Sequence, residues 1–291
     1  MMFTGALTAL VTPFRGGQVD IAALRELVEV QIQAGIDGLV PCGSTGESIN
    51  LSDREYRDVV RAVVEQTGGR VPVVAGAGTA STEHSLELAK IAREAKADGV
   101  MIVSPYYNKP TQEGLFAHFK TIALEASLPL VLYNIPGRTC VDISLETLER
   151  LAGIANIVAI KEATGNVLRS QEIVATFAGR FAVLAGDDAL ALAIMAVGGK
   201  GVISVSANVI PSQVVSVVHM FRDGDIAAAL DLHQSLLRFH QAMFVETNPA
   251  PVKAALAMLG RIAPEIRLPL VMPSDASQEK IRAAIEMVVS R

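Results

Sequence analysis

A lysine at position 161 ends an apolar segment that has the composition of a buried strand. In "NIVAIKEATGN" (156–166), the run 157–160 is rich in β-branched residues and Lys161 follows it directly. Side chains of a strand alternate between its two faces, so Ile157, Ala159 and Lys161 share one face. A lysine at a strand end usually extends its ammonium group into solvent. A lysine held partly out of water instead has a lowered pKa, and its neutral amine can attack a carbonyl group.

A second segment has residues that suit the binding of an anion. "CGSTGES" (42–48) places Ser44 and Thr45 between two glycines. Backbone N–H groups in such a loop can point at a carboxylate, and the two hydroxyls add further donors. A plain glycine-rich turn has the same composition. The segment by itself is therefore compatible with either interpretation.

Tyrosines and an arginine follow two further apolar runs. "LYNIPGRT" (132–139) contains Tyr133 and Arg138, and "SPYYNKPTQEG" (104–114) contains two adjacent tyrosines. A tyrosine hydroxyl can move a proton, and an arginine can hold a carboxylate with two parallel hydrogen bonds. Each residue taken singly also has a structural explanation. A tyrosine can pack in the core with its hydroxyl bonded, and an arginine can extend into solvent from a loop.

The elements that position these residues recur along the chain. Eight apolar runs have the character of strands, and segments with helical periodicity, such as 20–35 and 82–99, separate them. The runs are 6–13, 38–43, 71–78, 99–105, 128–136, 156–163, 181–188 and 201–208. The lack of polar alternation predicts strands that are buried on both faces. Eight such units favour an α/β fold of the (β/α)8 TIM barrel type over a doubly wound sheet, which is the alternative.

The pattern changes after residue 208, where strand-like runs stop. Four helical segments follow, and the first of them completes the barrel. We therefore predict a barrel over 1–224 that carries the active site and a C-terminal three-helix extension over 225–291. In a barrel of this kind the loops after the strands form the active site, which brings the candidate residues to one end.

Composition disfavours several classes of protein. The 291 residues have a net charge of −5 and no basic tract, which disfavours nucleic acid and anionic membranes as partners. The longest stretch without charged residues, 201–221, contains polar residues and a proline, so we expect no membrane span. Cys42 and Cys140 form no CxxC motif, and the five histidines form no HxH or HExxH motif. We therefore expect a reduced, cytoplasmic location and no metal site.

Seven segments together resemble the dihydrodipicolinate synthase family. They are "GLVPCGSTGES", "SPYYNKPTQEGLFAHF", "LYNIPGRT", "NIVAIKEATGN", "LAGDDA", "GVISVSAN" and "NPAPVKAAL". They occur in the order and spacing of the family and extend over almost the whole chain. The wider superfamily of pyruvate-dependent aldolases shares the GSTGE-type loop, the tyrosine and the lysine. The resemblance therefore implies Schiff-base chemistry on pyruvate.

For pyruvate, the resemblance assigns roles to five residues. Lys161 would form a Schiff base with the ketone, without any metal or organic cofactor. The backbone N–H groups of Ser44 and Thr45 would hold the carboxylate. Gly186 and Ile203 would line this part of the site through backbone and shape.

For the second substrate, the resemblance implies addition of the enamine to L-aspartate 4-semialdehyde. Arg138 would bind the carboxylate of this aldehyde. Tyr133 would move protons, and Thr45 would link it by hydrogen bonds to Tyr107, which reaches in from a neighbouring subunit. The product would be 4-hydroxy-tetrahydrodipicolinate, on the diaminopimelate route to lysine. The shared tyrosine implies a homo-oligomer, at least a tight dimer and commonly a dimer of dimers.

One departure from the family pattern keeps a second enzyme class open. Ser44 stands where the synthases usually have threonine and where sialic-acid lyases have serine. A lyase for N-acetylneuraminate or a keto-deoxy sugar acid would use the same Lys161. Arg138 and the "PYYN" segment favour the synthase. A catalytically inactive binding protein on this fold is a third class, although each expected catalytic position is occupied.

Another departure concerns regulation by lysine. Lysine-inhibited members bind the amino acid at a subunit interface, through a tyrosine pair with asparagine, glutamate and histidine partners. Tyr106 is present, but Ala80, His84 and Tyr56 stand at the positions of those three partners. The ammonium group of a buried lysine ligand would lose its anionic and amide partners. We therefore predict weak or absent feedback inhibition.

Overall fold

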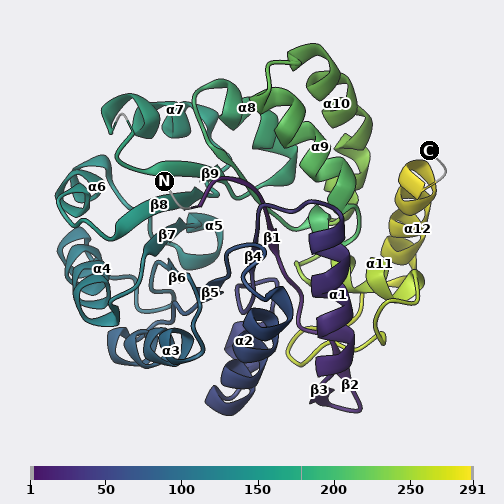
Figure 1. The fold of residues 1–291 in the computed structure, drawn as a ribbon, viewed down its shortest axis with the longest axis horizontal. Coiled ribbons are helices and arrows are strands. Elements are labelled where there is room, and N and C mark those ends of the chain that lie inside the picture. Colours follow the sequence, from purple (N-terminus) through teal and green to yellow (C-terminus); the bar gives the residue numbers. More distant parts are fainter. Residues whose placement is uncertain (1–2, 178, 290–291) are drawn as a thin grey trace.

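In the computed structural model, which describes residues 3–177 and 179–289, eight parallel strands form a ring that helices surround (Figure 1). The strands of the ring are β1 (Gly5–Ala9), β4 (Gly38–Val40), β5 (Val74–Gly76), β6 (Gly99–Val103), β7 (Leu130–Asn134), β8 (Ile157–Glu162), β9 (Ala182–Ala185) and β10 (Gly201–Ser204). Their hydrogen-bonded order is β4-β1-β10-β9-β8-β7-β6-β5, and a parallel bridge from Leu39 to Val73 closes the ring. The (β/α)8 barrel is therefore confirmed, and the doubly wound sheet is excluded.

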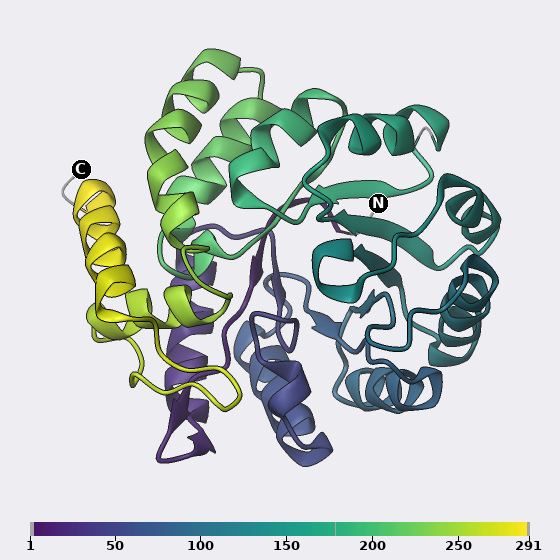
Figure 2. The same ribbon diagram turned by 180° about the vertical axis from the view of Figure 1, so that it is seen from behind.

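Helices cover the outside of the barrel between successive strands, as Figure 2 shows from behind. They are α1 (Ile21–Gln33), α2 (Asp53–Thr67), α3 (Thr82–Glu94), α4 (Gln112–Ala126), α6 (Leu145–Ala152), α7 (Val167–Thr176), α8 (Ala191–Ala196) and α9 (Pro211–Arg222). Shorter elements lie in the connections: a hairpin of β2 (Phe14–Arg15) and β3 (Gln18–Val19), α5 (Pro136–Thr139), and the 3-10 turns η1 (Ser48–Asn50), η2 (Asp188–Leu190) and η3 (Ser206–Asn208). The turns η1, η2 and η3 and helix α5 all follow the carboxyl ends of strands.

Local sequence explains where α2 begins. The hydroxyl of Ser52 accepts a hydrogen bond from the N–H of Glu55, and the Glu55 carboxylate accepts one from the N–H of Ser52. This reciprocal capping box satisfies two backbone donors that the helix itself leaves unpaired. The sequence "SDRE" predicts the box, and the structure contains it.

Several element ends differ from the ranges predicted from sequence. Of the run 71–78, only Val74–Gly76 forms strand β5, and Val73 adds the single bridge to Leu39 that closes the ring. The helix expected over 82–99 ends at Glu94. Glu162 is the buried last residue of β8, because the ladder with β9 continues one residue beyond Lys161.

Three further helices follow α9 in the described chain: α10 (Ile226–Ala242), α11 (Ala250–Met258) and α12 (Asp275–Val289). Helix α10 packs against α9 and α12, and α11 packs against η3 (Figure 1). Phe239, Val252 and Ile281 belong to the same buried apolar core as the barrel strands. The proposed division at residue 225 therefore separates two kinds of topology and not two hydrophobic cores. Among the described residues, no helix combines the length and apolar character needed to cross a membrane.

The continuous core predicts a global effect of a substitution in α12. Ile281 is fully buried, so Ile281→Ala leaves a cavity and should lower the free energy of unfolding by about 2–5 kcal/mol. We expect a single urea transition, followed in parallel by circular dichroism and by enzyme activity. The exposed neighbour Lys280→Ala is the control. A loss below about 1 kcal/mol, or a separate early transition that leaves the barrel folded, would contradict a shared core.

Candidate active site

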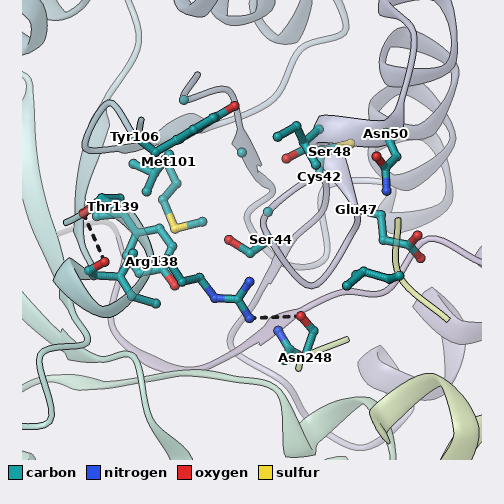
Figure 3. A pocket seen from close by; sticks show the side chains of 18 residues that line it. Cys42, Ser44, Glu47, Ser48, Asn50, Met101, Tyr106, Arg138, Thr139 and Asn248 are labelled. Atoms are coloured by element: carbon teal, nitrogen blue, oxygen red, sulfur yellow. Dashed lines mark hydrogen bonds between the residues drawn. The ribbon is translucent and has the colours of Figure 1, made fainter. Parts of the chain in front are cut away.

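A cavity of about 240 Å³ opens among the loops that follow β4, β5, β6 and β7 (Figure 3). Its lining includes Ser44 and Glu47 from the first of these loops, Tyr133 at the end of β7, and Arg138 in α5. Asn248, which comes from the segment before α11, also lines it. These residues come from the loop after β4, the end of β7, helix α5 and the segment before α11, and the closed barrel brings them to one end.

Lys161 lies in β8, between Tyr133 of β7 and Leu184 of β9. Its side chain is buried, and Nζ lies 4.3 Å from the centre of the Tyr133 ring. Burial lowers the pKa of Lys161 to about 8, the charge of Asp188 opposes this shift, and the charge of Arg138 adds to it. A snorkelling surface lysine is excluded, because only 4% of the residue is exposed.

The lowered pKa changes how much nucleophile is present at neutral pH. At the ordinary pKa of 10.5, roughly one amine in three thousand is neutral at pH 7. With the pKa at about 8, the neutral fraction is roughly one in ten. Burial at the strand end therefore increases the population of reactive amine by roughly three hundred-fold.

Tyr133 is buried beside Lys161, and its hydroxyl pairs with the side chain of Ser44. Burial raises the pKa of Tyr133 to about 12, while the charge of Arg138 and the hydrogen bond with Ser44 oppose the rise. The phenol is therefore protonated at neutral pH and can both donate and accept in a chain of hydroxyls. The structure corrects the expected partner, since the hydroxyl that contacts Tyr133 belongs to Ser44 and not to Thr45.

The hydroxyl of Thr45 is used in a different contact. It accepts a hydrogen bond of 3.0 Å from Nδ2 of Asn248, and both residues are buried. The main-chain carbonyl of Asn248 in turn accepts a hydrogen bond of 3.0 Å from Nη2 of Arg138 (Figure 3). Asn248 therefore contacts residues of both expected substrate half-sites. Its segment carries part of the family resemblance, but nothing in the sequence indicates these contacts, because its partners are 203 and 110 residues away.

The backbone of the GSTGE loop turns tightly above the barrel. The N–H groups of Gly46 and Ser48 both donate to the carbonyl of Gly43, at 3.0 and 3.3 Å. These turn bonds leave the N–H groups of Ser44 and Thr45 free of protein acceptors within the described structure. Adjacent N–H groups without protein acceptors are donors that a carboxylate ligand can use.

A buried ion pair fixes the end of this loop. Nζ of Lys253, in α11, lies 2.5 Å from Oε1 of Glu47 and donates to the carbonyl of Thr12 at 3.0 Å. The second oxygen of Glu47 accepts from the N–H of Arg267 at 3.0 Å. Burial lowers the pKa of Lys253 and the charge of Glu47 opposes that shift. Sequence analysis does not detect this pair, because its members are 206 residues apart.

The buried carboxylate of Asp188 lies near enough to Lys161 for its charge to act on the pKa of that lysine. Asp188 accepts hydrogen bonds from the hydroxyl of Ser204 and from the N–H groups of Val205 and Ser206, the latter two at 2.9 and 3.1 Å. These donors hold an anion within the electrostatic range of the Lys161 ammonium group. The sequence "GDDA" contains Asp188, but only the structure shows that it is buried and acts on Lys161.

The remaining expected residues occupy different environments. Gly186 donates from its N–H to the carbonyl of Glu162 at 2.8 Å, and a Cβ atom there would lie 2.5 Å from Cβ of Ala163, so the close approach requires glycine. Ile203 is buried in β10. Neither residue is among those that line the described cavity, and the same holds for Lys161 and Thr45, whereas their neighbours Tyr133 and Ser44 do line it. Tyr107 is 94% exposed and also lies outside the cavity, whereas its neighbour Tyr106 lines it.

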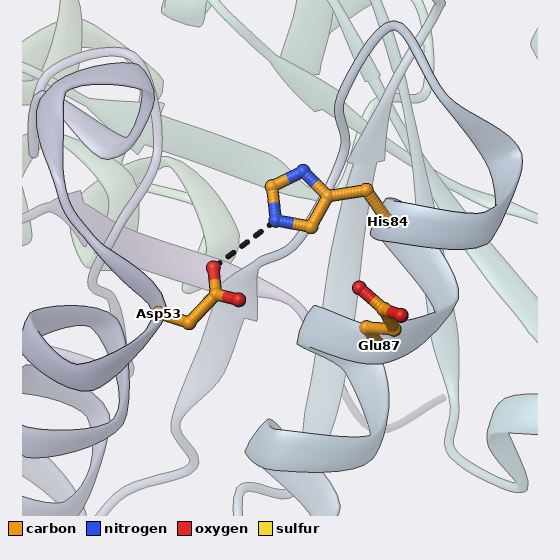
Figure 4. A group of neighbouring side chains, drawn as sticks. All are labelled: Asp53, His84 and Glu87. Carbon is orange, nitrogen blue, oxygen red and sulfur yellow. Dashed lines mark hydrogen bonds and ion pairs between the residues drawn. The ribbon is translucent and has the colours of Figure 1, made fainter.

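A second cavity, of about 170 Å³, adjoins the first and shares Tyr106 with it. Tyr56 and His84 line it. The buried hydroxyl of Tyr56 has no hydrogen-bond partner in the described structure, and Nε2 of His84 lies 3.1 Å from Oδ1 of Asp53 (Figure 4). Asp53, His84 and Glu87 hold their ligand-type atoms within 4.8 Å of one another. All three are exposed, and we assign no metal site to them.

The two cysteines lie in different environments. Cys42 is buried next to the GSTGE loop, and burial raises the pKa of its thiol. Cys140 is exposed at the end of α5. Cys42 is therefore a small buried side chain of the core, and Cys140 is not part of the core.

Comparison with known proteins places this geometry in a family. The sequence profile described as "Dihydrodipicolinate synthetase family" matches residues 2–288. The chain belongs to the dihydrodipicolinate synthetase family. Within this family, the 4-hydroxy-tetrahydrodipicolinate synthase of Nitratidesulfovibrio vulgaris is 52% identical over 283 residues, which are 97% of each chain.

Solved structures of the family have the same fold. The 4-hydroxy-tetrahydrodipicolinate synthase of Methylacidiphilum fumariolicum SolV is 44% identical and superposes with a TM-score of 0.97, over 99% of this chain and 96% of that one. The dihydrodipicolinate synthase of Acinetobacter baumannii is 42% identical, with a TM-score of 0.96 over 98% of both chains. That structure is a complex with pyruvate.

The pKa of Lys161 predicts how Schiff-base formation depends on pH. The rate should rise with pH and level off above about 8, because the neutral amine is the nucleophile. Asp188→Asn removes a charge that favours the ammonium form, so the midpoint should move to lower pH. Borohydride trapping of pyruvate between about pH 6 and about pH 10 measures the profile. Asp187→Asn is the matched control, since Asp187 is not among the groups that shift Lys161. A midpoint near 10.5 in the parent enzyme would contradict the buried amine.

Proposed function

We propose that this enzyme is a 4-hydroxy-tetrahydrodipicolinate synthase, which condenses pyruvate with L-aspartate 4-semialdehyde through a Schiff base on Lys161. The observation that carries the mechanism is the buried Lys161, with its pKa lowered to about 8, in contact with Tyr133. Membership of the family and about 50% identity to named synthases over nearly the whole chain support the choice of substrates.

The first half-reaction is imine formation with pyruvate. The neutral amine of Lys161 attacks the ketone carbon, and the resulting carbinolamine loses water to give the protonated imine. The free N–H groups of Ser44 and Thr45 are placed to bind the carboxylate of pyruvate. The Tyr133 hydroxyl, paired with Ser44, supplies the proton that leaves with the hydroxyl group as water.

The second half-reaction forms the carbon–carbon bond. Loss of a methyl proton converts the imine into an enamine, whose carbon attacks the aldehyde of L-aspartate 4-semialdehyde. The alkoxide takes a proton and becomes the 4-hydroxyl group. The amine of the second substrate then attacks the imine carbon, closes the ring and displaces the Lys161 amine. Arg138, at the rim of the cavity, is placed to bind the carboxylate of the aldehyde.

Ser44 takes the position in the proton path that we first expected for Thr45. Its hydroxyl pairs with Tyr133, while the hydroxyl of Thr45 pairs with Asn248. We therefore assign proton transfer to Tyr133 and Ser44, and we assign a structural role to the side chain of Thr45. Gly186 and Ile203 contribute shape behind the pyruvate site, since neither reaches the cavity lining.

We further propose that the enzyme acts as a homo-oligomer. The side chain of Tyr107 is 94% exposed next to the cavity-lining Tyr106, and Ile49 in η1 is 72% exposed. An exposed aromatic side chain at the rim of a site is suited to enter the site of a second copy. A tight dimer would provide that arrangement, and a dimer of dimers would repeat it.

The alternative substrates use the same first half-reaction. A serine at position 44 also suits a lyase for N-acetylneuraminate or a keto-deoxy sugar acid. Arg138 faces the cavity with a guanidinium group, which suits the carboxylate of the smaller amino-acid aldehyde. An inactive binding protein would not need an amine with a lowered pKa.

The decisive experiment measures turnover with pyruvate and L-aspartate 4-semialdehyde. Lys161→Ala should abolish the reaction and the borohydride-trapped adduct, because the nucleophile is lost. The exposed Lys200→Ala is the matched control and should retain both. Trapping on Lys161 without turnover of the aldehyde would move the assignment to a sugar acid. Absence of trapping would indicate a binding protein.

Inhibition by lysine should be weak or absent. The cavity beside Tyr106 presents Tyr56 and His84, and His84 already pairs with Asp53. Ala80 offers no side-chain acceptor to a bound ammonium group. Initial rates with increasing L-lysine measure the effect. Half-inhibition at low micromolar lysine would contradict this prediction.

A further inference from the structure

We propose that Asn248 is a positioning residue for the pyruvate half-site and that it acts through Thr45. The proposal rests on the carboxylate-binding role assigned above to the backbone of Ser44 and Thr45. It gives the C-terminal extension a function in substrate binding, which the sequence does not indicate.

The contact is local, buried and directional. Nδ2 of Asn248 donates to Oγ1 of Thr45 at 3.0 Å, and the exposed fractions of the two residues are 6% and 3%. Oδ1 of Asn248 is buried and has no partner in the described structure. The bond to Thr45 is therefore the one side-chain hydrogen bond of Asn248 among the described residues.

The C-terminal segment that contains Asn248 makes a second contact with the GSTGE loop, at Glu47, two residues after Thr45. Lys253, five residues after Asn248, forms the buried ion pair with Glu47. The C-terminal segment 248–253 therefore holds the GSTGE loop on both sides of Gly46. The turn bonds of the loop fix the carbonyl of Gly43, and they do not hold the side chain of Thr45. The Asn248 amide supplies that restraint.

This restraint matters because a carboxylate binds to two N–H groups only when both point at it. Loss of the Asn248 bond would leave a buried hydroxyl without its donor and allow the peptide at Thr45 to reorient. Pyruvate would then bind more weakly, because part of the binding free energy would be used to order the two N–H donors. Chemistry at Lys161 would change less, since the Tyr133–Ser44 pair does not involve Asn248.

The two contacts of Asn248 can be separated by mutation. Arg138 donates to the main-chain carbonyl of Asn248, which every side-chain variant retains. Thr45 depends on the side-chain amide. A side-chain substitution should therefore affect pyruvate and leave the aldehyde half-site intact.

The test compares Asn248→Ala, Thr45→Val and the double variant in steady-state kinetics with both substrates. We expect each single variant to raise the KM for pyruvate by about 5- to 20-fold, the loss of one buried hydrogen bond. The kcat and the KM for L-aspartate 4-semialdehyde should change by less than about threefold. The double variant should be no worse than either single variant, because both remove the same bond.

Asn156→Ala is the matched control. The Asn156 amide is also a hydrogen-bond donor within the protein, to the main-chain carbonyls of Ala123 and Leu128, but it lies at the other end of β8. This variant should lower stability without raising the KM for pyruvate. A comparable rise in Asn156→Ala would mean that general loosening, and not Thr45, explains the effect.

Three results would overturn the proposal. They are an unchanged KM for pyruvate in folded Asn248→Ala, additive effects in the double variant, and an equal rise in the KM for the aldehyde, which would indicate direct contact with that substrate. If Asn248→Ala does not fold, Thr45→Val alone must still raise the KM for pyruvate. Failure of the proposed function is separate, because it appears as absence of borohydride trapping in the unmutated enzyme.

Discussion

The removal of the Lys161 ammonium group from water is the constraint on which the rest of the site depends. A charged amine at the end of a strand is stable in solvent, and it becomes a nucleophile only where burial disfavours the charge. The barrel provides that burial, because β7 and β9 flank β8 and Tyr133 lies against the amine. The buried charge of Asp188 limits the fall in the pKa of Lys161, because it stabilises the ammonium form of that lysine.

Buried polar contacts connect the barrel to the helices that follow it. The pair Glu47–Lys253 is almost entirely out of water, and such a pair pays a desolvation penalty that good geometry only partly returns. Stability alone gives little reason for it. The position of the pair explains it better, because Glu47 belongs to the loop whose residues Gly43, Ser44 and Glu47 line the cavity. The extension is therefore part of the active-site wall.

The arrangement of hydroxyls separates proton transfer from loop geometry. Ser44 is bonded to Tyr133, and its neighbour Thr45 is bonded to Asn248. Two adjacent residues of similar chemistry thus point to different partners, one toward the reacting amine and one toward the scaffold. The family membership accounts for the substrates, and this division explains how a serine at position 44 supports the same chemistry, because the bond to Tyr133 needs only a hydroxyl.

Sequence alone determined the features that depend on neighbours along the chain. The eight apolar runs became the eight strands, and the Ser52–Glu55 capping box lies where it was predicted, because strand burial and helix capping are read from consecutive residues. The order of the family motifs also predicted Lys161, Tyr133 and Arg138 as site residues, and of these Tyr133 and Arg138 line the described cavity. Tertiary structure decided which hydroxyl meets Tyr133, and it revealed Asn248 and Lys253. The side chains of Asn248 and Lys253 contact Thr45 and Glu47, each more than 200 residues away, and only closure of the barrel and docking of α11 bring such groups within hydrogen-bond distance.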